Sequence, residues 1–263
     1  MSITITELYE GKVIMRFDSY HHTYTVTDEE KGLKDARVTG VSTVLDVIDK
    51  SRFLLPWAIR ETIDFVKENL KAGCIYDERQ IAKILSGAKS ASNNKKTDAG
   101  DFGTLLHEWV ESYVKGENPS MPINPTLRTS VEDFLKWTIK DDVKFERSEQ
   151  PLYSRKYRCA GTLDCIAYVT VKGKRGLYIG DWKTASGIYL SQKIQTAGYR
   201  MMREEEYPNE KYVGQFIMRF GKDGSFEKKF LSDEEEGLNR KLRYMFIHFL
   251  RAGNVYRELD KRY

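Results

Sequence analysis

The N-terminal part of the chain shows two kinds of hydrophobic pattern. Apolar and polar positions alternate over residues 12–26, and Asp18-Ser19 supplies turn chemistry between the two runs, so a β-hairpin is predicted there. Ser42 is a candidate cap for a short helix, and apolar residues then recur at helical spacing over residues 55–70, until Gly73 offers a stop. We therefore expect a small hairpin followed by a helix.

The next part of the chain is predicted to be helical. Residues 77–90, 103–115 and 126–139 each carry apolar side chains at the spacing of one helix face. Between the first two lies the polar stretch 90–96, which contains two asparagines followed by two lysines. Such a composition is typical of a loop, and we expect this segment to be mobile.

After Lys144 the pattern changes to strand-like runs. They cover residues 145–157, 161–171, 177–184, 212–220 and 226–231. Helical spacing returns over residues 188–206 and 238–259. Helices thus precede a mixed sheet that is interrupted and closed by further helices, which predicts an α/β or α+β fold. We expect an N-terminal hairpin and helical subdomain over residues 1–100, packed on a catalytic core over residues 101–263.

Composition and charge narrow the class of protein. Of the 263 residues 40% are apolar and 31% are charged, a balance typical of a folded globular chain. Lys and Arg number 43 against 39 Asp and Glu, so a net charge of +4 gives only a mild attraction for polyanions, and nucleic-acid affinity must come from local patches. No secretory signal and no apolar run long enough to cross a bilayer is seen, so no membrane association and a cytoplasmic location are expected.

The cysteines do not form a metal-binding motif. Cys74, Cys159 and Cys165 lack the short Cys-x-x-Cys pairing that zinc and iron-sulfur sites generally need. They are interpreted as reduced, mostly buried thiols.

Two strand segments carry the candidate chemistry. Asp181 and Lys183 are two residues apart on a predicted strand, so their side chains share one face. The short basic turn 172–176 makes the strand that contains Asp164 an antiparallel neighbour, which can bring Asp164 within reach of Asp181. Two adjacent carboxylates repel each other unless a cation lies between them, and Mg²⁺ or Mn²⁺ is the natural candidate. Any one of these residues alone is better explained as an exposed turn or strand-edge residue.

The segments Gly161-Thr-Leu-Asp164 and Gly180-Asp-Trp-Lys183-Thr184 together resemble the core of the PD-(D/E)XK nuclease superfamily. The similarity is to its RecB-like branch, which includes CRISPR-adaptation exonucleases, the mitochondrial genome maintenance exonuclease and many phage proteins. Segment 103–113, which contains His107, and Gln195-Thr-Ala-Gly-Tyr199 are similar to two further motifs of that branch. Leu163 replaces the usual proline. The cysteines of the iron-sulfur members are missing, so no such cluster is expected.

The resemblance, which covers residues 103–199, implies a restriction-endonuclease-like core and a role for each matched residue. Asp164, Asp181 and His107 would hold Mg²⁺ or Mn²⁺, and Lys183 would assist the attacking water. Gln195 and Tyr199 share a helix face and would position the DNA strand. The further candidates are Glu149 and the backbone carbonyl of Trp182 as metal ligands, and Lys193 and Arg200 as phosphate contacts. Glu111, one turn after His107, is better explained as a solvated side chain.

The implied activity is a metal-dependent deoxyribonuclease, by analogy an exonuclease acting in recombination, repair or phage DNA metabolism. Its expected partners are DNA and a recombination or replication protein. A structure-specific endonuclease on the same fold is the nearest alternative, and a noncatalytic DNA-binding or assembly protein is the alternative from another class. The intact set of Asp164, Asp181 and Lys183 argues against the noncatalytic alternative. Strand polarity, the preference for single- or double-stranded DNA and the oligomeric state do not follow from the sequence.

Overall fold

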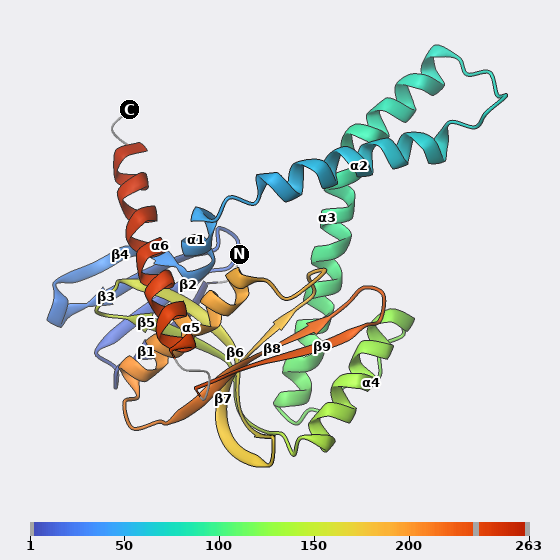
Figure 1. Cartoon of the computed structure of the whole chain (residues 1–263). Helices are drawn as coiled ribbons and strands as arrows, with labels where there is room; N and C mark the ends of the chain where they lie inside the picture. The colour runs from blue at the N-terminus through green and yellow to red at the C-terminus, as the bar shows by residue number, and fades with distance from the viewer. Residues whose placement is uncertain (1–2, 234–236, 261–263) are drawn as a thin grey trace. The chain divides into compact units, whose positions relative to one another are not determined.

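The structure is a computed structural model that describes residues 3–233 and 237–260 (Figure 1). The chain forms two compact units, each considered by itself. The sheet unit comprises Met1–Val47 and His107–Tyr263, and the helical unit comprises Ile48–Leu106. The first 47 residues therefore belong with the long sheet and not with the helical segment that follows them, because their last strand pairs within that sheet.

The expected mixed sheet flanked by helices is confirmed. Nine strands of the described chain form one sheet in the order β1-β2-β3-β4-β6-β7-β8-β9, and β5 pairs with β6 outside this path. Its N-terminal strands are β1 (Ile3–Leu8), β2 (Val13–Asp18), β3 (Thr23–Asp28) and β4 (Leu33–Gly40). Its later strands are β5 (Lys144–Ser154), β6 (Cys159–Val171), β7 (Lys174–Lys183), β8 (Tyr212–Phe220) and β9 (Phe226–Ser232). The β4–β6 and β7–β8 pairs are parallel and the others antiparallel.

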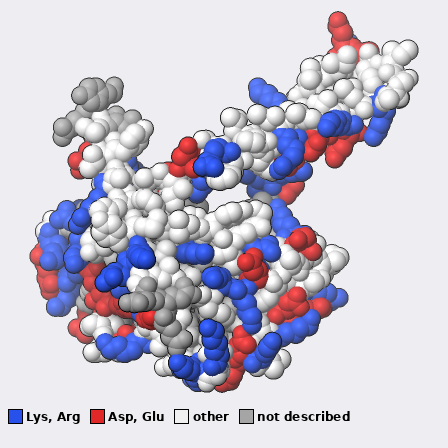
Figure 2. Space-filling view, in the orientation of Figure 1, with Lys and Arg blue, Asp and Glu red and all other residues white. Residues whose placement is uncertain are grey.

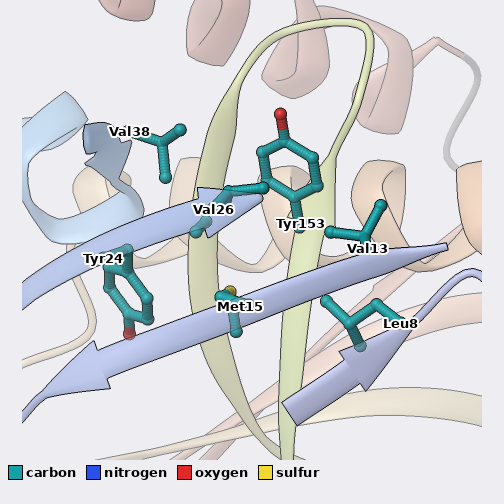
Figure 3. Close-up of a cluster of buried hydrophobic side chains, with 8 residues drawn as sticks. Leu8, Val13, Met15, Tyr24, Val26, Val38 and Tyr153 are labelled. Atoms are coloured by element: carbon teal, nitrogen blue, oxygen red, sulfur yellow. The ribbon is translucent and has the colours of Figure 1, made fainter. Parts of the chain in front are cut away.

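The predicted hairpin is the β2–β3 pair, to which β1 and β4 add one strand on each side. Alternate residues of these strands point inward and form a hydrophobic cluster that also takes in Tyr153 of β5 and Ala160 of β6 (Figure 3). Its other members are Leu8, Val13, Met15, Tyr24, Val26 and Val38. The cluster fixes the four N-terminal strands against the strands that carry the candidate site.

Helices cover both faces of the long sheet. The short α1 (Val41–Val44) follows β4, and the later helices are α4 (Pro125–Lys140), α5 (Leu190–Glu206) and α6 (Leu238–Asp260), close to their predicted bounds. Figure 1 shows α4 on one side of the sheet and α5 with α6 on the other. An aromatic layer joins the α4 side to the sheet, formed by Trp109, Tyr113, Phe134, Trp137, Phe145, Trp182, Phe216 and Phe220. On the other side, Phe246 of α6 packs against Gly198 of α5.

The predicted mobile loop at residues 90–96 is wrong. One helix, α3 (Glu78–Val114), runs through this segment and replaces the two shorter helices that were expected. In the helical unit, Ala88 and Ala91 are buried and Lys95 forms an ion pair with Glu61 of α2 (Ser51–Asn69). These contacts stabilise the helix across a stretch whose composition alone favours a loop, because tertiary packing overrides local propensity.

None of the described helices combines the length and the apolar character needed to cross a bilayer. The three cysteines are free thiols, with Cys159 and Cys165 buried and Cys74 exposed.

Candidate functional site

Asp181 and Lys183 lie near the end of β7, on the face opposite Trp182. The Asp181 side chain has no exposed surface, while Trp182 points into the aromatic layer under α4. Lys183 Nζ lies 2.5 Å from Asp181 Oδ2. This ion pair compensates the buried charge of Asp181 in part.

Asp164 is brought beside Asp181 by the antiparallel pairing of β6 with β7. The ladder ends at the pair Cys165 and Gly180, so Asp164 and Asp181 are the next residues on the two strands. Oδ2 of Asp164 accepts a hydrogen bond of 2.7 Å from the backbone N–H of Trp182. Burial raises the pKa of Asp164 and of Asp181, and Lys183 opposes the shift in both. The β6–β7 pairing therefore places Asp164 and Asp181 next to each other.

The glycine before Asp181 is required by close packing. A Cβ at Gly180 would lie 2.1 Å from the Phe216 ring and 2.5 Å from Cys165 Sγ. These contacts are far inside van der Waals distance. Gly180 therefore lets β7 approach its neighbours closely at the point where it delivers Asp181.

His107 and Glu149 converge on Asp164 from other elements. His107 lies on α3 and Glu149 on β5, and one ligand atom of each residue, with one from Asp164, falls within 4.8 Å of the other two. Burial lowers the pKa of His107, and the positive charge of Lys183 lowers it further. The imidazole is therefore neutral and keeps a lone pair available for a metal. It also interacts with the backbone of Trp182.

Glu149 stands directly across from Asp164 in the sheet. The pairs Ser148–Cys165 and Gln150–Leu163 on either side set this register. Glu149 has a φ of 45°, a left-handed conformation that costs a non-glycine residue about 1–3 kcal/mol. Burial raises the pKa of Glu149 to about 8, and the charges of Asp164 and Glu111 add to the effect. Strain and like-charge repulsion at one residue indicate a constraint other than stability.

These residues fit a hard divalent cation. They offer carboxylate oxygens and one neutral imidazole nitrogen, a donor set suited to Mg²⁺ or Mn²⁺, while Asp181 pairs with Lys183 beside them. Glu111 forms an ion pair with Lys115 on its own helix and contributes to the site through its charge.

The Gln195 and Tyr199 pair lies on α5 beside the carboxylates. Gln195 Nε2 donates a 2.9 Å hydrogen bond to Tyr199 Oη. Burial raises the pKa of Tyr199, and the charges of Asp181 and Asp164 raise it further, which places the phenol next to both. A Cβ at Gly161 would lie 2.8 Å from Tyr199 Cε1. Gly161, the first residue of the Asp164 motif, thus makes room for the ring of Tyr199.

Arg200 and Lys193 differ in what they offer a phosphate. Arg200 is buried, and its guanidinium donates to Glu204 and Asp233 at 2.7 Å and to the carbonyl of Tyr212 at 2.6 Å. These partners occupy its Nε, Nη1 and Nη2, so the structure places Arg200 in the packing of α5 and not at a DNA surface. Lys193 is half-buried on the same helix.

Tyr24 is a site neighbour that the sequence did not reveal. Its hydroxyl lies 3.4 Å from Oγ1 of Thr162, two residues before Asp164. Burial raises the pKa of Tyr24, and the charge of Glu149 also raises it. The alternation in the hairpin predicts an inward-facing residue at this position, but the contact depends on the packing of the N-terminal strands against β6.

The charged surface does not form one basic face. In the view of Figure 2, basic and acidic side chains of the sheet unit are interspersed. Any affinity for DNA must therefore arise from local features near the site.

Comparisons with known proteins return weak similarities. No family model matches the chain, and no curated protein matches it. The crystal structure of SSO0001 is similar with a TM-score of 0.36 and 12% sequence identity, over 78% of this chain and 85% of that one. A candidate exonuclease from Eubacterium rectale has a TM-score of 0.33 and 12% identity over the same shares. Similarities this low establish neither a shared fold nor a shared activity.

Proposed function

We propose that the protein is a metal-dependent deoxyribonuclease that hydrolyses DNA phosphodiester bonds. The observation that carries the proposal is the gathering of carboxylates around one lysine: Asp181 is fully buried and paired with Lys183, Asp164 adjoins it on the neighbouring strand, and His107 and Glu149 converge on Asp164. An arrangement of this kind lowers stability unless a cation compensates the charge. Hydrolysis of a phosphodiester is the reaction that such a cation, two carboxylates and a lysine are suited to perform.

Asp164, Asp181, His107 and Glu149 would hold Mg²⁺ or Mn²⁺, together with the backbone carbonyl of Trp182. A divalent cation bound there lowers the pKa of a water molecule and neutralises phosphodiester charge. The neutral imidazole of His107 offers nitrogen as a ligand, and Asp164 is held in place by the N–H of Trp182.

Lys183 acts as a charged donor and not as a base. Burial opposes its charge, but Asp181 and Asp164 outweigh burial and raise the pKa of the ammonium. The protonated Nζ can orient the attacking water and stabilise negative charge that develops on the phosphate. Asp181 keeps this ammonium at the site through their ion pair.

Gln195 and Tyr199 would position the DNA strand. Tyr199 is fixed by burial and accepts a hydrogen bond from Gln195, so the amide of Gln195 is held in one orientation beside the carboxylates. Lys193 would contact a phosphate from the preceding part of the helix.

We further propose an exonuclease that acts in recombination, repair or phage DNA metabolism with a partner protein of that process. A structure-specific endonuclease would use the same residues. A noncatalytic DNA-binding role is the third candidate, and the intact set of Asp164, Asp181 and Lys183 argues against it, because clustered buried carboxylates kept at such a cost are unexplained without a reaction.

The experiment is incubation of end-labelled linear DNA and of circular DNA with the protein in Mg²⁺ or Mn²⁺. We expect the wild type to cleave linear DNA. Asp181→Ala and Lys183→Ala should each lower the cleavage rate by at least about a hundredfold, the usual effect of removing one group that stabilises the transition state. The surface variant Lys241→Ala should cleave at the wild-type rate. Nicked circles would indicate an endonuclease. An inert wild type with every metal and substrate would remove the catalytic proposal.

The metal can be tested separately from cleavage. Calorimetric titration with Mn²⁺ should show binding to the wild type and much weaker binding to His107→Ala. Unchanged binding in this variant would remove His107 from the ligand set.

A further inference from the structure

The β2–β3 hairpin carries a set of aromatic side chains next to the candidate site. Phe17 and Tyr24 are register partners on the two strands, and their rings stack with centroids 4.6 Å apart at 25°. The ring of His22 lies 5.9 Å from that of Phe17. At the hairpin turn, Tyr20 packs edge-on against His21. Phe17, His22, Tyr24 and Tyr20 are called the aromatic shelf below.

The shelf extends from solvent to the candidate site. Tyr20 is 71% exposed and His22 is exposed, whereas Phe17 is half-buried and Tyr24 is only 9% exposed. Tyr24 is also the member whose hydroxyl approaches Thr162 and whose phenol is influenced by Glu149. The buried end of the shelf therefore adjoins the carboxylates.

Packing in the hydrophobic cluster explains why Tyr24 and Phe17 are aromatic, but it does not explain Tyr20 and His22. Tyr24 belongs to the hydrophobic cluster of the N-terminal strands (Figure 3), and Phe17 packs against that cluster. Tyr20 and His22 contribute no buried surface to it, since both are exposed. Exposed aromatic rings on a hairpin whose buried ring adjoins a site indicate a ligand with flat faces.

The shelf is suited to bases more than to phosphates. Asp18 at the turn accepts hydrogen bonds from the backbone N–H groups of Tyr20 and His21 and pairs with the His21 ring. Arg16, which precedes Phe17 on β2, pairs with Asp35. The nearby charges are thus matched within the protein, and the rings are what the hairpin offers a ligand.

We propose that the aromatic shelf stacks unpaired bases of the DNA strand whose phosphodiester lies at the carboxylates. This inference rests on the proposed function and adds the substrate class to it. A base inside a duplex has both faces covered, so stacking of this kind requires single-stranded DNA or a frayed end. Because stacking is tolerant of sequence, the shelf would hold any base.

The test compares two phosphorothioate single strands, one with bases that include 2-aminopurine and one with abasic sites only. The variants are Tyr20→Ser, His22→Asn, which keeps a residue tolerant of the left-handed φ of 49°, and Phe17→Leu. The control is Tyr244→Ser on α6, where the wild-type tyrosine is 63% exposed and its ring also lies on a histidine. Circular dichroism identifies variants that do not fold, and Tyr20→Ser and His22→Asn keep the test valid if Phe17→Leu fails.

We expect the wild type to quench 2-aminopurine fluorescence, and each shelf variant to bind the base-carrying strand about tenfold more weakly, since one stacked base contributes about that much. Binding of the abasic strand and the salt dependence of binding should not change, because the phosphate contacts remain. Equal affinities across all variants, or equal losses on both strands, would overturn the shelf.

The two proposals fail in different ways. Cleavage of ordinary single-stranded DNA by wild type and shelf variants alike, with no difference in base binding, leaves the nuclease and removes the shelf. Quenching that depends on Tyr20 and His22 in a protein that cleaves nothing leaves the shelf as a base-binding surface and removes the nuclease.

Discussion

Asp181 lies in surroundings that an isolated carboxylate avoids. It is fully buried and Asp164 adjoins it on the neighbouring strand, while Lys183 supplies one compensating positive charge. Glu149 adds a further carboxylate and a strained backbone. The clustered carboxylates and the strain lower stability in the absence of a cation. The site is therefore expected to show a measurable conflict between stability and metal binding.

Glu149→Gln should make that conflict visible, because it replaces a carboxyl group whose ionisation is disfavoured opposite Asp164 by an amide that does not ionise. In EDTA we expect the free energy of unfolding to rise by about 1 kcal/mol, a typical size for a single substitution. Mn²⁺ at about a hundred times its Kd should stabilise the wild type by about 2.7 kcal/mol and the variant by less. Urea unfolding followed by tryptophan fluorescence measures both, with the exposed Glu117→Gln as control. A variant that is less stable than wild type in EDTA would contradict this prediction.

Gly161→Ala should disturb the site through Tyr199. The added Cβ would lie 2.8 Å from Tyr199 Cε1 and 3.0 Å from Val41 Cγ2, so one of these side chains must move. We expect a loss of about 1–3 kcal/mol in the free energy of unfolding, as in other overpacked sites. In the double variant with Tyr199→Leu the two losses should not add, because the second change removes the atom that clashes. Strict additivity would show that Tyr199 does not limit the size of residue 161.

At the scale of elements, the spacing of hydrophobic residues predicted most helices and strands, but it did not show that two predicted helices are one. The segment around Asn93 to Lys96 has a loop-like composition, yet it is helical because Ala91 is buried and Lys95 pairs with Glu61. Strands β1 and β4 were missed; in β1, Ile3 and Ile5 alternate with threonines but are exposed, and only Leu8 is buried in the core.

The candidate site divides in the same way. The relation of Asp181 to Lys183 follows from spacing within one strand, and that of Asp164 to Asp181 from a short turn between neighbours. The position of Glu149 opposite Asp164 depends on the register of β5 against β6. The contact of Tyr24 with Thr162 depends on pairing between β4 and β6, far apart in the chain. Local sequence patterns specify neither the register between two strands nor the pairing of strands that are far apart in the chain.

Two glycines of α3 in the helical unit allow a matched prediction. A Cβ at Gly87 would lie 2.5 Å from the ring of Phe65 on α2, whereas a Cβ at Gly100 meets nothing within 4 Å. Gly87→Ala should lower the free energy of unfolding by about 1–3 kcal/mol. Gly100→Ala should raise it by about 0.5–1 kcal/mol, because alanine favours the helix. Thermal unfolding followed by circular dichroism checks both, and stabilisation by both substitutions would show that Gly87 does not pack against α2.

At the scale of the whole sheet unit, distant parts of the chain are joined by one polar network around Glu210. Glu210 lies between α5 and β8, and its carboxylate accepts hydrogen bonds from Arg147 of β5 at 2.8 Å and from Arg203 of α5 at 2.9 Å. The hydroxyl of Tyr212 donates to the same carboxylate. The network joins α5, and with it the Gln195 and Tyr199 pair, to β5, which carries Glu149, and to β8, the neighbour of the strand that carries Asp181.

This network predicts how stability depends on pH. Burial disfavours the charged form of Glu210, but hydrogen bonds from Arg203 and Tyr212 outweigh it and lower the pKa to about 2. A folded-state pKa below the unfolded value of about 4.5 stabilises the protein above pH 4.5, and this stabilisation is lost as pH falls toward 2. Glu210→Gln should therefore cost about 2 kcal/mol at pH 7, with the partial exposure of the group taken into account, and progressively less below pH 4.5. Urea unfolding at pH 7, 5, 4 and 3 measures the difference.

The control is Glu227→Gln, which breaks an exposed pair with Arg219 and should cost less than about 0.5 kcal/mol at pH 7. A difference for Glu210→Gln that stays constant or grows on acidification would show that the carboxylate of Glu210 does not join these elements.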